Sequence, residues 1–206
     1  MSMEVNMYLS KIMLSGAACR NPYEVHRALW KLFKEDAFAS RDFLYRVGHS
    51  DRNRVEILMQ SIREPIISSN VAHILACKEY SLPLFSSQKL RFMLIANPIK
   101  MINDASGRKN SDGQSKKCRV PLVHENDQRN WIERKLLDAA SLETLVIDPV
   151  FPLRFRKGKD GAGKIKPVSY QGILIVEEPG KMIDLVRKGI GPAKAFGCGL
   201  LTLARV

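Results

Sequence analysis

The chain has 206 residues, a length that fits one large domain or two small ones. Hydrophobic residues make up 45% of it, and 33 Lys and Arg against 21 Asp and Glu leave a formal net charge of +12. This composition excludes a disordered chain. The surplus of positive charge favours a polyanionic partner, with nucleic acid as the first candidate, over a basic but inert surface.

The sequence also argues against a membrane protein and a metal site. No apolar run approaches the roughly 20 residues of a membrane span, and the charged start MSMEVNMYLSK is no signal peptide, so we expect a cytosolic protein. The four cysteines are scattered singly, without a histidine at metal-ligand spacing. We therefore expect reduced cysteines, no bound metal and no cofactor. They are Cys19, Cys77, Cys118 and Cys198.

The first half of the chain predicts a strand followed by a helix. Met7–Leu14 is a mixed apolar run, typical of a largely buried strand. In NPYEVHRALWKLF, Asn21 can cap a helix and Pro22 suits its first turn. Apolar residues then recur at helical spacing and predict one buried stripe. They are Val25, Leu29, Leu32 and Phe33.

Two further strands are predicted at Phe43–Val47 and Val55–Ser61, joined as a hairpin by the polar turn GHSDRN. Ser69–Leu75 predicts a short helix, and the run to about Leu84 predicts a closing strand.

The second half repeats this order. Leu90–Lys100 predicts a strong strand whose regular pairing ends at Pro98. Gly107–Arg119 is polar and basic and predicts a mobile loop, and Asn126–Ala140 predicts a helix.

Two more strands, Thr144–Phe155 and Ile165–Glu177, are predicted to flank a tip rich in Gly and Lys. A helix over Pro179–Lys188 should end at Gly189, before a last strand over Gly199–Ala204. Two successive β-α-β-β-α-β units predict an α+β fold of two tandem ferredoxin-like (RRM-like) domains. We expect residues 1–88 to form the first domain, which carries the candidate catalytic helix, and residues 89–206 the second.

His26 has the most informative setting of the four histidines. It follows Tyr23 by three residues, so both side chains share one face of the predicted helix, with Arg27 beside them. An imidazole can take or give a proton near neutral pH, as phosphodiester cleavage requires. Spacing alone, however, favours an ordinary surface histidine beside a tyrosine.

A basic strip brackets the tip GKDGAGK. Alternate residues of a hairpin point the same way, so Arg154, Arg156, Lys164 and Lys166 can share one face that lies along an RNA backbone. Lys157 and Lys159 extend the strip, and a solvated hairpin is the alternative. Arg129 and Arg134 predict a second basic surface on the helix of the second half.

The run GIGPAKAFGCGLLTLA has glycines at four positions just before the last strand. It matches neither a Walker A loop nor a Rossmann turn. Its backbone could approach phosphate, although a tight helix-to-strand turn explains the glycines equally well. They are Gly189, Gly191, Gly197 and Gly199.

Together NPYEVHRALWKLF, RDFLYRV, LIANPIK, KKCRVPL and GIGPAKAFGCGLLTLARV resemble the CasE-type repeat endoribonucleases of type I-E CRISPR systems, in the right order over nearly the whole chain. The resemblance implies tandem ferredoxin-like domains that bind the stem-loop of the CRISPR repeat and cut at the base of the stem without metal. The 2′-hydroxyl would attack, leaving a 5′-hydroxyl and a cyclic or 3′ phosphate.

Carried over by motif, His26 would be the general acid or base, and Tyr23 would position the phosphate or the nucleophile. The basic hairpin and the glycine-rich loop with Lys194 would bind RNA, together with Arg27 and Lys31 on the helix. The family's members keep their product in the Cascade complex, so further partners would be other Cascade subunits, first the backbone subunit. The alternatives are an RNA-hairpin-binding subunit that does not cut and, less favoured, a ribosome-associated structural protein.

Overall fold

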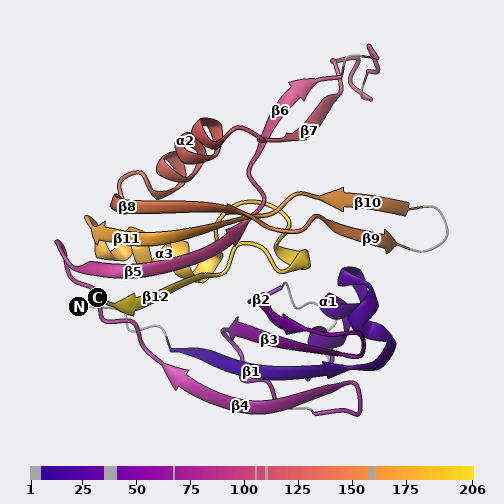
Figure 1. Cartoon of the computed structure of the whole chain (residues 1–206), viewed down its shortest axis with the longest axis vertical. Helices are drawn as coiled ribbons and strands as arrows, with labels where there is room; N and C mark the ends of the chain where they lie inside the picture. Colours follow the sequence, from indigo (N-terminus) through magenta and orange to yellow (C-terminus); the bar gives the residue numbers. More distant parts are fainter. Residues whose placement is uncertain (1–5, 35–40, 67, 105, 110, 158–160) are drawn as a thin grey trace.

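The structure is a computed structural model that describes residues 6–34, 41–66, 68–104, 106–109, 111–157 and 161–206. In this part of the chain the strands form two four-stranded antiparallel sheets and two separate hairpins. In Figure 1 the two sheets lie one above the other, and both hairpins project beyond them.

The first sheet is covered by one helix. Its strands are β1 (Met7–Ser15), β2 (Phe43–Ser50), β3 (Arg54–Ser61) and β4 (Ala72–Tyr80), in the order β2-β3-β1-β4. A 3-10 turn, η1 (Gly16–Arg20), leads into α1 (Pro22–Trp30). The apolar side of α1 packs on this sheet, and the residues of that core include Ile12, Leu14, Val25, Leu29, Ile57 and Met59.

The second sheet is covered by two helices. Its strands are β5 (Lys89–Ala96), β8 (Ala140–Pro149), β11 (Val168–Val176) and β12 (Leu201–Arg205), in the order β12-β5-β11-β8. The helices are α2 (Glu125–Leu136) and α3 (Pro179–Lys188). The core beneath them includes Phe92, Leu94, Trp131, Ile132, Tyr170 and Met182.

Both sheets have the strand order of a ferredoxin-like unit. In each, the last strand pairs with the first, and the second strand lies at the far edge. The predicted fold class is thereby confirmed. The division at residue 88 fits the start of β5 at Lys89, and we keep it as a proposal.

The helix predicted over Ser69–Leu75 is wrong. This stretch leads into β4, an edge strand that pairs only with β1, so its outer side chains face solvent. Leu75 is 51% exposed, for example. An edge strand with both polar and apolar exposed residues lacks the alternation that identifies a strand.

One hairpin interrupts two of the predicted strands: Ile165–Glu177 divides at Ile165, where the hairpin ends, and continues as β11 from Val168. The run predicted over Thr144–Phe155 stops at Pro149 and resumes as β9 (Leu153–Lys157), which pairs with β10 (Gly161–Ile165). Pro149, the last residue of β8, and Pro152, between β8 and β9, have no N–H to donate to a ladder. This pair, β9–β10, is called the basic hairpin below.

The loop predicted over Gly107–Arg119 is only partly a loop. Its end forms β7 (Lys117–Pro121), which pairs with β6 (Ile99–Asn103) as a projecting arm. The strand predicted over Leu90–Lys100 divides at Pro98 between β5 and β6, as that proline indicated.

Candidate nucleic-acid interface and active site

A basic cleft of about 680 Å³ lies where the two halves of the chain meet. Its walls come from Arg41 just before β2, the base of the β6–β7 arm, the basic hairpin and the loop before β12. Five cations line it, with Asn97 as a neutral polar neighbour, and a polyanion fits such a lining. They are Arg41, Arg119, Lys164, Lys166 and Lys194.

The glycine-rich loop, residues 189–199, needs its glycines for two physical reasons. All four have φ between +72° and +93°, a region that L side chains rarely adopt. A Cβ would also collide with a neighbour: at Gly191 it would lie 2.9 Å from the Trp131 ring, and at Gly189 2.7 Å from the Leu44 side chain. The loop is thus wedged between the two halves of the molecule.

The backbone of this loop is largely engaged with the protein itself. The N–H groups of Gly189 and Gly199 donate to the carbonyls of Leu185 and Ile95, at 2.8 and 2.7 Å. The Tyr45 hydroxyl donates to the Ala195 carbonyl at 2.8 Å. The buried glycines therefore shape the loop, whereas Gly191 and the residues from 192 to 196 form its cleft-facing surface.

Lys194 is held inside the cleft wall. Its Nζ donates to the Lys188 carbonyl. Partial burial, together with the neighbouring positive charges of Arg41 and Lys135, lowers the pKa of Lys194. The residue is therefore an oriented cation rather than a freely moving one.

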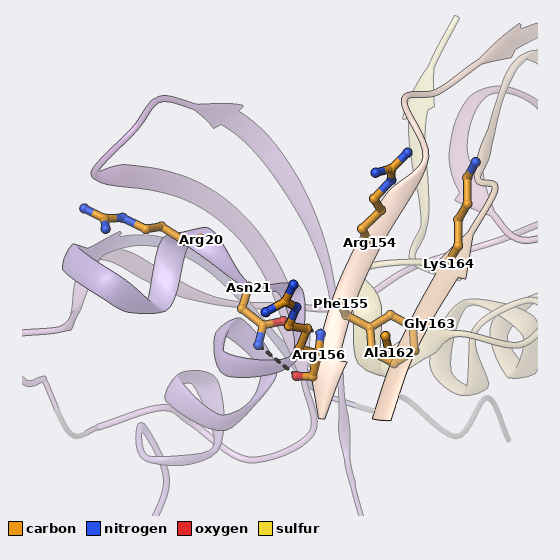
Figure 2. Close-up of a pocket in the computed structure, with 8 residues that line it drawn as sticks. All are labelled: Arg20, Asn21, Arg154, Phe155, Arg156, Ala162, Gly163 and Lys164. Carbon is orange, nitrogen blue, oxygen red and sulfur yellow. Dashed lines mark hydrogen bonds between the residues drawn. The ribbon is translucent and has the colours of Figure 1, made fainter. Parts of the chain in front are cut away.

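The basic hairpin has one charged face and one apolar face. Lys164 pairs directly with Arg154, and Arg156 follows two residues later, so all three share a face. Figure 2 shows Arg154 and Lys164 extending in the same direction from the two strands. Lys166 follows the end of β10 and lines the cleft. Lys157 ends β9, and Lys159 lies outside the described residues.

The apolar face of this hairpin packs on the glycine-rich loop. The Phe155 ring lies 4.2 Å from the Phe196 ring, centroid to centroid. Opposite Phe155 stands Gly163, where a Cβ would approach the ring to 2.3 Å. Gly163 thus leaves the space that lets Phe155 lie across the hairpin.

A second cavity, of about 650 Å³, lies on the other side of the basic hairpin and is shown in Figure 2. Arg20 and Asn21 line it from η1 and the start of α1, and Arg154, Arg156 and Lys164 line it from the hairpin. The basic hairpin therefore borders two adjoining hollows, and Lys164 lines both of them.

His26 lies half-buried on α1 in an aromatic surround. Its ring is 5.5 Å from the Phe43 ring and 6.2 Å from the Trp30 ring, centroid to centroid. Within the described part of the chain, its buried Nε2 has no hydrogen-bond partner. Burial, with a smaller contribution from the positive charge of Arg41, lowers the pKa of His26 to about 4. The free protein therefore presents a neutral imidazole next to a residue of the cleft.

The other candidate residues of α1 lie at or near its surface. Tyr23 is partly exposed in the first turn, on the same helix side as His26 by its spacing. Arg27 is exposed and pairs with Glu24 at 3.2 Å, and Lys31 is exposed at the helix end. Neither Arg27 nor Lys31 lines the two cavities described above.

Arg129 and Arg134 are not brought to the cleft. On α2, Arg129 faces Glu125 at 3.8 Å, and the Arg134 guanidinium donates to the Asn130 carbonyl. Arg134 lines a shallow hollow of its own with Lys100 and two acidic residues. The two arginines form a surface separate from the basic hairpin.

Sequence reasoning missed Arg41, Arg119, Arg20 and Phe196. Arg41 and Arg119 occur in RDFLYRV and KKCRVPL, two segments that carried the family resemblance, but neither segment alone indicates that they share a cleft. The pairing of Phe155 with Phe196 joins positions that only the fold brings together.

Two features are absent from the described residues. No three His, Cys, Asp or Glu side chains gather there as a metal site would require. None of the helices there is long and apolar enough to cross a membrane.

Fold and site together define a protein of two ferredoxin-like units that meet at a basic cleft, with a neutral histidine at its margin. A family model described as "CRISPR associated protein" matches residues 7–205. The chain is 42% identical to the CRISPR system Cascade subunit CasE of Escherichia coli K12, covering 96% of this chain and 99% of CasE. It is 31% identical to the CRISPR-associated endoribonuclease Cse3 of Thermus thermophilus, covering 96% of this chain and 100% of Cse3.

Solved structures agree. The crystal structure of Cas6e from E. coli K-12 matches with a TM-score of 0.83 and 40% identity, covering 97% of this chain and 100% of that one. Cse3 of T. thermophilus, bound to an RNA representing a pre-cleavage complex, matches with a TM-score of 0.75 and 27% identity, covering 97% and 99%. The chain therefore belongs to the CRISPR-associated protein family that includes CasE and Cse3.

Proposed function

We propose that this protein is a metal-independent endoribonuclease that cuts CRISPR precursor RNA at the base of the repeat stem-loop. The observation that carries the proposal is His26, a neutral imidazole beside the basic cleft whose Nε2 has no hydrogen-bond partner in the part of the chain that the structure describes. The relatives support the substrate and the setting: Cse3 is named an endoribonuclease, and CasE is named a Cascade subunit. We propose that this chain likewise stays on the mature guide RNA within Cascade.

The RNA backbone would follow the cations of the cleft and of the basic hairpin. Arg154, Arg156 and Lys164 share one face, and Lys166 and Lys194 continue it into the cleft. Phosphate contacts of this kind position a nucleic acid without reading its sequence. We keep Arg27, Lys31, Arg129 and Arg134 as outer contacts with the RNA, Lys157 and Lys159 as part of the strip, and the four glycines as the frame of the loop.

Each proposed chemical step uses a group from the RNA or from this chain. Neutral His26 takes the proton of the 2′-hydroxyl, and the 2′-oxygen attacks the adjacent phosphorus. The bond from phosphorus to the 5′-oxygen then breaks, and the protonated His26 returns its proton to the departing 5′-oxygen. The products are a 5′-hydroxyl, a 2′,3′-cyclic phosphate and neutral His26. Tyr23 would position the phosphate or the nucleophile. A bound phosphate raises the pKa of a nearby imidazole, so the base strength of His26 would increase as RNA binds.

The test is cleavage of a labelled repeat hairpin in EDTA, with binding followed in parallel. We expect the wild type to cut, and His26→Ala to bind within about threefold while the rate falls by about 10²–10⁴, the usual contribution of general acid-base catalysis. His49→Ala is the matched control, because His49 is exposed in β2. Its rate should equal that of the wild type.

The same assay separates the second candidate function. A protein that binds the repeat hairpin but never cuts it is an RNA-hairpin-binding subunit, a function that the basic cleft alone would support. Cutting by His26→Ala at the wild-type rate would contradict the role of His26, and cutting only with added metal would contradict metal independence.

A further inference from the structure

Asn21 connects the candidate catalytic helix to the basic hairpin. Its Oδ1 accepts a hydrogen bond from the Tyr23 N–H at 3.2 Å, which caps α1. Its Nδ2 donates to the Arg156 carbonyl at 2.9 Å, the bond drawn as a dashed line in Figure 2. The Arg156 N–H completes the set by donating to the same Oδ1 at 3.4 Å.

These bonds join residues 135 positions apart in the sequence. Capping needs only the side-chain oxygen of Asn21, and serine or aspartate would supply one equally well. The amide nitrogen has a different role, because it engages a backbone carbonyl of another element. Asn21 is thus both a helix cap and a cross-link.

Among the described residues, contacts with α1 and with the glycine-rich loop hold the basic hairpin in place. Its two strands form a sheet of their own, separate from the larger sheets. The Phe155 ring packs on Phe196, and Asn21 bonds to the backbone of the next residue of β9, Arg156. An isolated two-stranded hairpin has little stability of its own, so these anchors fix its direction relative to α1.

His26 lies only five residues beyond Asn21 on the same rigid helix. We infer that Asn21 is a positioning residue. It fixes the position of the charged face of the basic hairpin relative to His26, so that bound RNA places its scissile phosphate next to the imidazole. This inference rests on the proposed ribonuclease function. A misplacement of about 1 Å at a reacting centre can slow a reaction by about 100-fold, even when binding is unaffected.

The experiment compares Asn21→Ser, Asn21→Asp and the wild type. Serine keeps an oxygen for the cap but is too short to reach Arg156 at the same time. Aspartate keeps the cap and an acceptor for the Arg156 N–H but has no amide to donate. We expect the single-turnover rate at saturating protein to fall by about 10- to 100-fold in Asn21→Ser, and by at least as much in Asn21→Asp, because a carboxylate oxygen would face the Arg156 carbonyl oxygen and repel it. Affinity for the RNA should stay within about threefold in both, because every cation remains.

A second readout does not depend on cleavage. Backbone amides of β9 should exchange with deuterium faster in Asn21→Ser than in the wild type, because the hairpin loses its tie to α1. Asn126→Ser, the same change at an exposed position of α2, is the control and should alter neither exchange nor rate.

Each outcome supports or overturns the positioning role of Asn21. A slower cut with unchanged affinity and faster exchange of β9 supports the inference. A wild-type rate in Asn21→Ser overturns it, and so does a parallel loss of rate, affinity and melting temperature, which would mark a purely structural role. If the wild type itself does not cut, the proposed function falls first and the positioning role falls with it.

Discussion

His26 combines three features: aromatic neighbours, a cation nearby and a buried ring nitrogen that has no hydrogen-bond partner among the described residues. A histidine with only a structural role usually has that nitrogen hydrogen-bonded. Burying the polar atom alone is unfavourable for folding, and strain of this kind is tolerated where a site needs it. The free energy of unfolding should therefore depend on the protonation of His26.

Because of His26, we expect the protein to lose stability as the pH falls. The pKa of His26 is about 4 in the folded protein and 6.5 when unfolded, so the unfolded chain binds more protons between these values and stability falls as pH drops from 6.5 towards 4. At pH 5 the full shift would correspond to about 2 kcal/mol, and we expect about 1 kcal/mol because the ring is only partly buried.

Thermal unfolding at pH 7.5 and pH 5 checks this. The wild type should lose about 2–4 °C more than His26→Gln, which cannot titrate. The depressed carboxyl pKa values of Asp51, Asp104 and Asp184 act equally in both proteins and cancel in the comparison. Equal losses in the two proteins would contradict the burial of a neutral His26.

At the scale of elements, Gly163 determines whether the basic hairpin can pack on the glycine-rich loop. An alanine there would place its Cβ 2.3 Å from the Phe155 ring and push Phe155 away from Phe196. Overpacking of this size destabilises by about 1–2 kcal/mol locally, which is roughly a 5- to 30-fold rise in the open population.

Trypsin measures that population where it cuts after Arg154, Arg156 and Lys164, which lie in the paired strands, so cutting after these residues and not at the tip is the readout. We expect Gly163→Ala to be cut within the hairpin about 5- to 30-fold faster than the wild type. Gly48→Ala in β2 is the control, since a Cβ there meets its nearest atom at an ordinary 3.5 Å. Identical digestion of Gly163→Ala and wild type would show that the contact of Phe155 with Phe196 does not hold the hairpin in place.

Local signals predicted some elements well and could not predict others. The helix over Pro179–Lys188 was predicted to the residue, because a proline start and a glycine stop bound an amphipathic run. Strand β7 was missed, since KKCRVP becomes a strand only by pairing with β6 across a polar turn. Likewise His26 could be singled out from its helix, but Arg41 and Asn21 gain their meaning from residues far along the chain.

For the whole molecule, the question is whether the net charge of +12 acts as a diffuse field or through the cleft. Lys164 lines the cleft and also shares the charged face of the basic hairpin with Arg154. Lys89 starts β5 at the end away from the cleft and pairs with Glu143. Removing Lys89 or Lys164 changes the net charge equally, so the two variants separate the possibilities.

We expect affinity for the repeat hairpin to fall about 10³-fold between 50 and 200 mM salt, as about six phosphate contacts would require. In a plot of log affinity against log salt, Lys164→Ala and Arg154→Ala should each reduce the slope by about 1. Lys89→Ala should leave the slope unchanged, because a charge outside the interface displaces no counterion from the RNA. Equal slopes for Lys89→Ala and Lys164→Ala would mean that the overall field, rather than the cleft, holds the RNA.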